Sequence, residues 1–154
     1  MTNPVLLLSG LGMIAVGIIP VLYWGRTRRV AAMPLVFGGA LWVAAITPKV
    51  ALDLVVGESV NSWAYSALGA TGSFILLSLY VGLRTGLFES GFSYVAFLKT
   101  KLRKATYDEA IGFGLAFGGT EAVLLGLSSL LNVLLFVLNP SLIDQIPVAQ
   151  RAAV

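Results

Sequence analysis

Apolar residues fill four long stretches of the chain, and short polar breaks separate them. A helix that spans a membrane needs about 20 consecutive, mostly apolar residues, and each stretch reaches that length. We therefore predict an all-α fold, a polytopic transmembrane bundle of four long helices over residues 1–138 with a short tail over 139–154. The predicted spans cover residues 4–24, 30–56, 63–98 and 107–138.

The polar breaks define the ends of these spans. They lie at residues 26–29, 57–59 and 99–104, and the last span ends at Asn139-Pro140, where proline removes a backbone donor. The third span is the longest, because its roughly 36 residues would measure about 54 Å as a straight helix. That length exceeds the bilayer core and predicts either a tilted helix or a break near Gly82 and Gly86.

The basic residues are few and predict the orientation of the bundle. Charged residues make up 11% of the chain and the mean hydropathy is +0.92, whereas soluble domains carry about 25% charge. Lys and Arg gather in the breaks at residues 26–29 and 99–104, which the positive-inside rule places in the cytoplasm. We predict a multi-pass protein of a prokaryotic plasma membrane with both termini extracytoplasmic. The expected partners are other integral membrane proteins and lipids, and not nucleic acid.

Two residue types are absent from the sequence, and their absence limits its chemistry. Without cysteine there is no disulfide, thiolate metal site or cysteine nucleophile, and without histidine the commonest metal ligand and general base is missing. We therefore predict no metal and no cofactor, while bound lipid is compatible with the composition. The N-terminus lacks a basic segment before its first apolar stretch, so we expect a retained helix and not a cleaved signal peptide.

Five ionisable residues fall inside or near the predicted spans, where such residues usually face the bundle interior and form pairs. Lys49 and Asp53 are four residues apart, which predicts an interfacial pair on one helix face. Arg84 and Glu121 lie about 14 residues, or roughly 21 Å, from the cytoplasmic ends of their spans, which predicts an intramembrane ion pair. With Glu89 nearby, this cluster either locks the helices together or lines a hydrated path.

Small residues at four-residue spacing predict where helices pack closely, because lipid gives helices little hydrophobic reason to associate. The predicted seam makes the last span central. Its members are Gly82, Gly86, Gly114, Gly118, Ala122 and Gly126.

Two motifs in the second half of the chain resemble a known family. Residues 86–93 read Gly-Leu-Phe-Glu-Ser-Gly-Phe-Ser, a basic run follows, and residues 117–122 read Phe-Gly-Gly-Thr-Glu-Ala before a run of leucines. Both resemble motifs of the YhfC family of intramembrane metalloproteases, distant relatives of the type II CAAX prenyl proteases. Family members continue through further helices, so the resemblance implies that this chain corresponds to the N-terminal half of that fold.

The departures from the family pattern fall on the residues that the resemblance implies are catalytic. Glu89 and Glu121 stand where the family has glutamates, but Ser90 replaces a second glutamate, Ser93 an arginine and Phe117 a histidine. Glutamates and histidine would hold a metal and activate water, and phenylalanine ligates nothing.

These observations lead to one hypothesis and two alternatives. The hypothesis is a non-catalytic membrane subunit, a protease-like scaffold that packs within a larger membrane complex. The first alternative is a divergent intramembrane metalloprotease or hydrolase that uses Glu89 and Glu121, since carboxylates can bind divalent metals. The second alternative is a transporter or proton-relay element lined by Arg84, Glu89 and Glu121.

Overall fold

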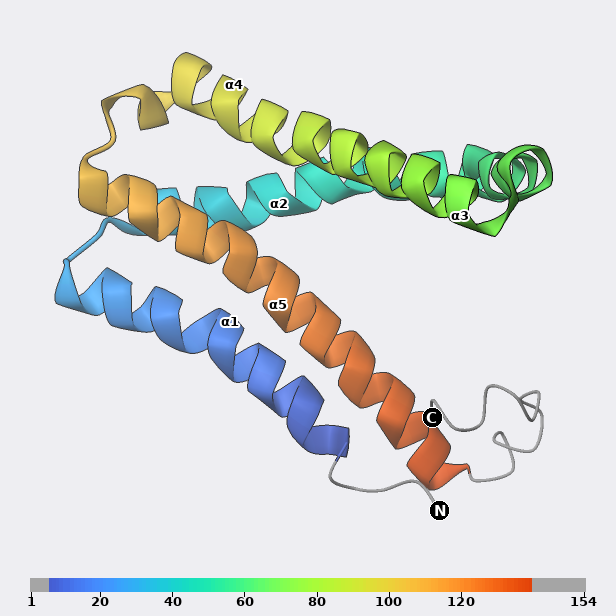
Figure 1. Ribbon diagram of the computed structural model, residues 1–154. Helices are drawn as coiled ribbons and strands as arrows, with labels where there is room; N and C mark the ends of the chain where they lie inside the picture. Colours follow the sequence, from blue (N-terminus) through green and yellow to red (C-terminus); the bar gives the residue numbers. More distant parts are fainter. Residues whose placement is uncertain (1–5, 140–154) are drawn as a thin grey trace.

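The computed structural model describes residues 6–139, and every element in that range is helical, as predicted (Figure 1). Three elements depart from α-helical geometry: η2 and η3 are π-helical turns and η4 is a 3₁₀ turn. The elements in chain order are α1 Leu7–Thr27, α2 Ala32–Leu52, η2 Asp53–Gly57, α3 Glu58–Thr85, η3 Gly86–Ser90, α4 Gly91–Lys99, η4 Lys101–Lys104 and α5 Tyr107–Leu138.

Within residues 6–139 three helical stretches are long and apolar enough to cross a membrane: Leu7–Thr27, Ala32–Lys99 and Tyr107–Leu138. The sequence predicted four, because it placed a break at residues 57–59. That break is wrong, since Gly57 and Glu58 both have α-helical backbone angles and η2 passes directly into α3. Polar residues at this point do not end the helix. Of the predicted tail, residues 140–154 lie outside the described residues.

The 68-residue stretch Ala32–Lys99 folds back on itself at Gly69. Gly69 has φ 65° and ψ −175°, a conformation that only glycine adopts readily. Ion pairs join Lys49 to Glu89 and Asp53 to Arg84. In each pair, the midpoint between the two residue numbers lies within one residue of position 69. The stretch is therefore a helical hairpin, whose two arms run side by side in Figure 1. The chain does not break near Gly82 and Gly86, where the helix only widens into η3.

Helices α1 and α5 pack in antiparallel fashion along glycines that allow their backbones to touch. A Cβ atom added at Gly17 would lie 2.6 Å from the carbonyl oxygen of Gly119, and one at Gly126 would lie 2.8 Å from that of Gly10. Gly10 and Gly17 are seven residues apart, as are Gly119 and Gly126. Seven residues are two helical turns, so this spacing stays on one face of a long helix. We call this contact the glycine seam.

The observed glycine seam corrects the predicted one. Of the six predicted members, Gly126 lies in it, whereas a Cβ at four others would meet nothing within 4 Å: Gly82, Gly86, Gly114 and Gly118. A spacing of four residues drifts around a helix over several turns, and the seven-residue repeat was the informative one. Helix α5 is central, as predicted, because it packs against both α1 and α2.

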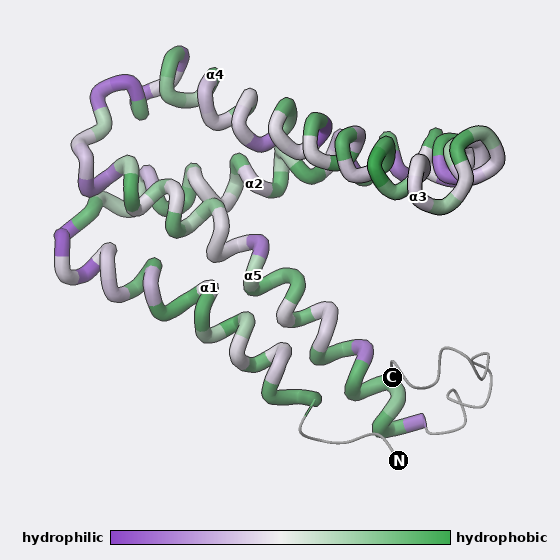
Figure 2. Tube along the Cα trace, in the orientation of Figure 1, coloured by the Kyte–Doolittle hydropathy of each residue, from purple (hydrophilic) through white to green (hydrophobic). Residues whose placement is uncertain are grey.

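The two basic breaks lie at the same end of the molecule. Figure 2 shows hydrophilic segments gathered where α1 joins α2 and where α4 joins α5. There the indole Nε1 of Trp24 donates a hydrogen bond of 3.0 Å to the carbonyl oxygen of Asp108. Thr106 begins α5 with a capping box, in which its hydroxyl accepts from the Glu109 backbone and the Glu109 carboxylate accepts from the Thr106 N–H. Leu102, 2% exposed within the basic run, packs into the apolar cluster below it.

Candidate functional site

The hairpin holds a group of four charged side chains that contact one another across its arms. The Lys49 Nζ atom lies 2.5 Å from the Glu89 Oε1 atom, and these side chains are 10% and 20% exposed. One turn nearer Gly69, the Arg84 guanidinium donates to the Asp53 carboxylate. Each base therefore pairs with a carboxylate of the opposite arm, and the four residues form two rungs of a ladder, which we call the charge ladder.

The π turn η3 makes the second arm fit this ladder. Arg84 and Glu89 are five residues apart, which in an α-helix would point them about 140° away from each other. In a π turn the backbone bonds run from a residue to the fifth one back, as from the Gly91 N–H to the Gly86 carbonyl. The wider turn brings Glu89 to the side of Arg84, so that both face the first arm. On that arm Lys49 and Asp53 need only the ordinary four-residue spacing.

The structure pairs these residues differently from the sequence prediction. Lys49 and Asp53 do lie one turn apart in the same arm, but each takes its partner from the other arm. Arg84 pairs with Asp53 and not with Glu121. The prediction assumed that the helix of Arg84 packs along α5, whereas α5 packs against α1 and α2 and diverges from α3 in Figure 1.

Glu121 stands apart from the charge ladder, on α5. Its side chain is half-buried, and within residues 6–139 it forms no ion pair. The neighbouring hydroxyl of Thr120 donates within its own helix, to the Ala116 carbonyl oxygen at 2.8 Å. The two glutamates that the resemblance singles out thus lie in different environments, with Glu89 bound to a lysine and Glu121 without a cation among the described residues.

Phe117 occupies the position at which the family motif has histidine, and it packs as an apolar side chain. Its ring lies 6.1 Å from that of Phe113, which makes an edge-on contact of 5.1 Å with Phe97. Phe113 is 4% exposed and belongs to the apolar cluster with Ala96 and Leu102. Phe117 therefore adds to the hydrophobic cluster that joins α4 to α5.

The donor atoms in this structure do not fit a catalytic metal. Catalytic zinc needs three protein ligands, and residues 6–139 contain no group of three His, Cys, Asp or Glu side chains placed to hold a metal ion. The full sequence has neither histidine nor cysteine, so only carboxylates could serve. Of these, Glu89 and Asp53 are already engaged by bases. We derive no chemical step through a metal at this site.

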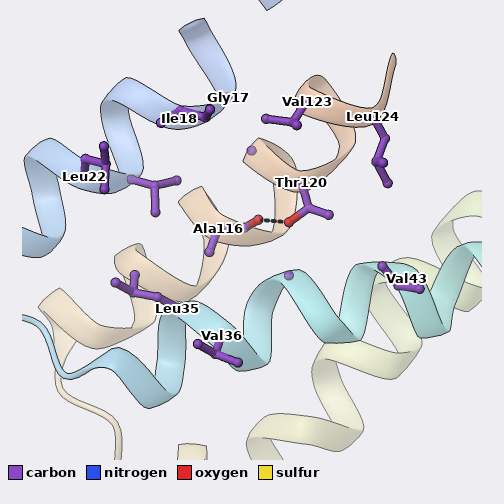
Figure 3. Close-up of a pocket in the computed structure, with 13 residues that line it drawn as sticks. Gly17, Ile18, Leu22, Leu35, Val36, Val43, Ala116, Thr120, Val123 and Leu124 are labelled. Atoms are coloured by element: carbon purple, nitrogen blue, oxygen red, sulfur yellow. Dashed lines mark hydrogen bonds between the residues drawn. The ribbon is translucent and has the colours of Figure 1, made fainter. Parts of the chain in front are cut away.

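An apolar cavity of about 560 Å³ lies between α1, α2 and α5 (Figure 3). Residues from all three helices line it, including Gly17, Val36 and Val123, and among the lining residues Thr120 carries the one polar side chain. Such a lining suits a hydrocarbon chain and offers nothing to a charged ligand. Sequence reasoning missed this cavity, because it arises from three segments far apart in the chain.

Comparison with known proteins identifies the family. A family model described as YhfC intramembrane metalloprotease matches residues 12–150. No curated protein and no solved structure matches the chain. The family match spans nearly the whole sequence and includes the charge ladder, Phe117 and Glu121. On this basis the chain is a membrane protein that belongs to the YhfC intramembrane metalloprotease family.

Proposed function

We propose that this chain is a non-catalytic integral membrane subunit, a protease-like scaffold that packs within a larger membrane protein complex. The observation that carries the proposal is the 2.5 Å contact between Glu89 and Lys49. In the family this glutamate belongs to the proteolytic motif, whereas here its carboxylate is one half of a structural ion pair.

The chemistry of Glu89 supports this assignment. A carboxylate that ligates a metal or takes a proton from water must keep an oxygen lone pair directed at the reacting centre. The Lys49 ammonium competes for that carboxylate from the facing arm of the hairpin. Phe117, in the family's histidine position, supplies packing to Phe113 in place of a ligand.

The proposal includes a topology of four crossings in a prokaryotic plasma membrane. The 68 residues of Ala32–Lys99 would extend about 100 Å as one straight helix, more than three times the bilayer core. Reversal at Gly69 divides them into two arms that can each cross once. With the basic breaks in the cytoplasm, the hairpin tip and both termini lie outside.

Mild-detergent purification of the tagged chain from its native membrane tests the subunit role. We expect it to elute with other membrane proteins at a mass well above its own 16.2 kDa. A stable, isolated monomer would contradict the proposal.

Because the chain has no cysteine, Ser66→Cys near the hairpin tip and Lys101→Cys in the basic run test the topology. An impermeant thiol reagent applied to intact cells should label only Ser66→Cys.

A second candidate function is a divergent intramembrane metalloprotease that uses Glu89 and Glu121, and the family match favours it. Purified chain in liposomes would be loaded with Zn²⁺, washed, analysed for bound metal and mixed with a fluorogenic transmembrane substrate. The scaffold assignment expects no metal-dependent cleavage. If the chain binds one zinc ion and cleaves the substrate, and Glu121→Gln abolishes the cleavage, then the chain is an enzyme and the scaffold proposal is wrong.

A further inference from the structure

The face of α5 that points away from α1 carries a second regular stripe of residues. Its spacing alternates between four and three residues, which keeps all members on one side of a helix. Five of the six are exposed and Glu121 is half-buried. We call it the outer stripe, and its members are Gly114, Gly118, Glu121, Leu125, Ser128 and Asn132.

The outer stripe has the pattern of a helix-packing surface. The glycine seam follows the same spacing on α5, displaced by two residues, through Gly112, Ala116, Gly119, Val123 and Gly126. There α1 fills the grooves beside Gly119 and Gly126, and Val30 and Leu35 fill the groove beside Gly112. In the outer stripe a Cβ at Gly114 or Gly118 would meet nothing within 4 Å, so the grooves are open towards a further helix.

The composition of the outer stripe differs from that of most exposed positions on α1. Most exposed positions on α1 are large and apolar, such as Leu8, Val16 and Ile19, which are 62–69% exposed. Such side chains suit contact with lipid. The outer stripe instead combines glycine, serine, asparagine and a carboxylate, the small and polar residues that membrane helices use to associate.

The charge of Glu121 specifies the chemistry of the missing helix. A carboxylate at membrane depth is costly unless it is paired, and within residues 6–139 the two intramembrane bases, Lys49 and Arg84, are already engaged. A second copy of the chain fits poorly, because a symmetric contact along this stripe would bring two Glu121 carboxylates together.

We propose that the outer stripe binds a transmembrane helix of another protein, which presents small residues to Gly114 and Gly118 and an arginine or lysine to Glu121. This inference rests on the proposed function, since it names the surface through which the subunit joins its complex. The glycines let the backbones approach, and the ion pair sets the depth and identity of the partner helix.

The test uses the full chain in lipid vesicles and a designed transmembrane peptide as the probe. The peptide is a leucine-rich helix with one mid-membrane arginine, flanked on both sides by glycines at four-residue spacing. Its counterpart has leucine in place of the arginine. Fluorescence energy transfer between labelled peptide and labelled chain measures association. We expect the arginine peptide to bind roughly threefold to tenfold more tightly than the leucine peptide.

Two variants of the chain localise the effect, and a third serves as a control. Glu121→Gln keeps the shape of the side chain and should abolish the preference for arginine. Gly118→Leu fills the groove and should weaken binding of both peptides. Gly12→Leu on α1 changes another exposed glycine with open space beside it, outside the stripe, and should leave both affinities unchanged. Circular dichroism of each variant checks that the helices remain folded.

Equal binding of the two peptides, or a preference that survives Glu121→Gln, would overturn the inference. Self-association of the chain that Gly118→Leu abolishes would also overturn it, by assigning the stripe to a second copy. Arg151 lies outside the described residues. The variant Arg151→Gln should bind the arginine peptide as tightly as the wild type does. Tighter binding by this variant would mean that Arg151 is itself the partner of Glu121, and would overturn the inference. If the peptides behave as expected but the chain purifies alone from its native membrane, the surface stands and the subunit role fails.

Discussion

Two helix pairs in this molecule are joined by opposite means. Helices α1 and α5 meet along the glycine seam, where carbonyl oxygens of one helix lie beside glycines of the other. Among the described residues no ion pair joins these two helices. The arms of the hairpin are joined by the charge ladder, whose two ion pairs set their register. Neither pair of helices is driven together by hydrophobic force, because the surrounding lipid is as apolar as the helices.

The two kinds of contact should respond to different substitutions. A backbone contact gains from many weak dispersion contacts and fails when side-chain volume intrudes. An ion pair accepts changes of volume nearby but fails when one charge is removed, because the other remains desolvated. Volume should therefore be the sensitive variable between α1 and α5, and charge the sensitive variable in the hairpin.

The largest expected effect follows from adding volume to the glycine seam. Gly17→Leu would place its Cβ 2.6 Å from the Gly119 carbonyl oxygen and 2.8 Å from Val123, so the two backbones would have to move apart. We expect the free energy of unfolding to fall by about 3 kcal/mol. Titration with sodium dodecyl sulfate in mixed micelles, followed by circular dichroism, measures it. Gly12→Leu is the control, and an equal loss in both variants would refute the role of the glycine seam.

Removing a base from the charge ladder should have the next largest effect. Lys49→Met keeps the side-chain length and leaves the Glu89 carboxylate, 20% exposed, without its cation. We expect a loss of about 2 kcal/mol in the same titration, below the value for a fully buried pair because Glu89 keeps some exposure. The double variant Lys49→Met with Glu89→Met should recover most of that loss. If the two changes are instead additive, the residues do not interact.

A smaller effect is expected at the second rung of the ladder. Asp53→Asn removes the negative charge beside Arg84, whose side chain is 11% exposed, but keeps an amide oxygen that accepts from the guanidinium, and at a position 53% exposed water replaces part of the interaction. We expect a loss of about 1 kcal/mol or less. Lys49→Met provides the comparison within the same ladder. A larger loss for Asp53→Asn than for Lys49→Met would contradict the prediction that the Lys49–Glu89 pair is the stronger of the two.

Sequence reasoning predicted the elements well where local signals decide them. Residues 107–138 are helical as predicted, because a capping threonine begins the helix and an Asn-Pro pair follows its end. The break at residues 57–59 failed because polar residues do not themselves end a helix. The reversal at Gly69 was missed because the chain has 17 glycines, and the positive φ that distinguishes this one appears only in three dimensions.

The candidate site shows a similar limit. The sequence identified Lys49, Asp53, Arg84 and Glu89 as the residues that matter, because charge within apolar helices is conspicuous. It did not give their partners, since pairing depends on which helices are neighbours and on the π turn at η3. Nor did it distinguish the occupied stripe of α5 from the outer one, because both follow the same spacing.

The smallest expected effect tests whether a polar bond also holds α1 to α5. Trp24→Phe removes the indole N–H that donates to the Asp108 carbonyl oxygen, while retaining most of the aromatic volume. We expect a loss of about 0.5 kcal/mol, at the low end of the usual range for one hydrogen bond, because this bond is only part-buried. Trp42→Phe is the comparison, because the buried Trp42 N–H has no hydrogen-bond partner within the described residues and the change breaks no hydrogen bond there. Should Trp24→Phe cost as much as Gly17→Leu, the hydrogen bond at the basic end would share with the glycine seam the role of holding these helices together, and the contrast between the two helix pairs would no longer stand.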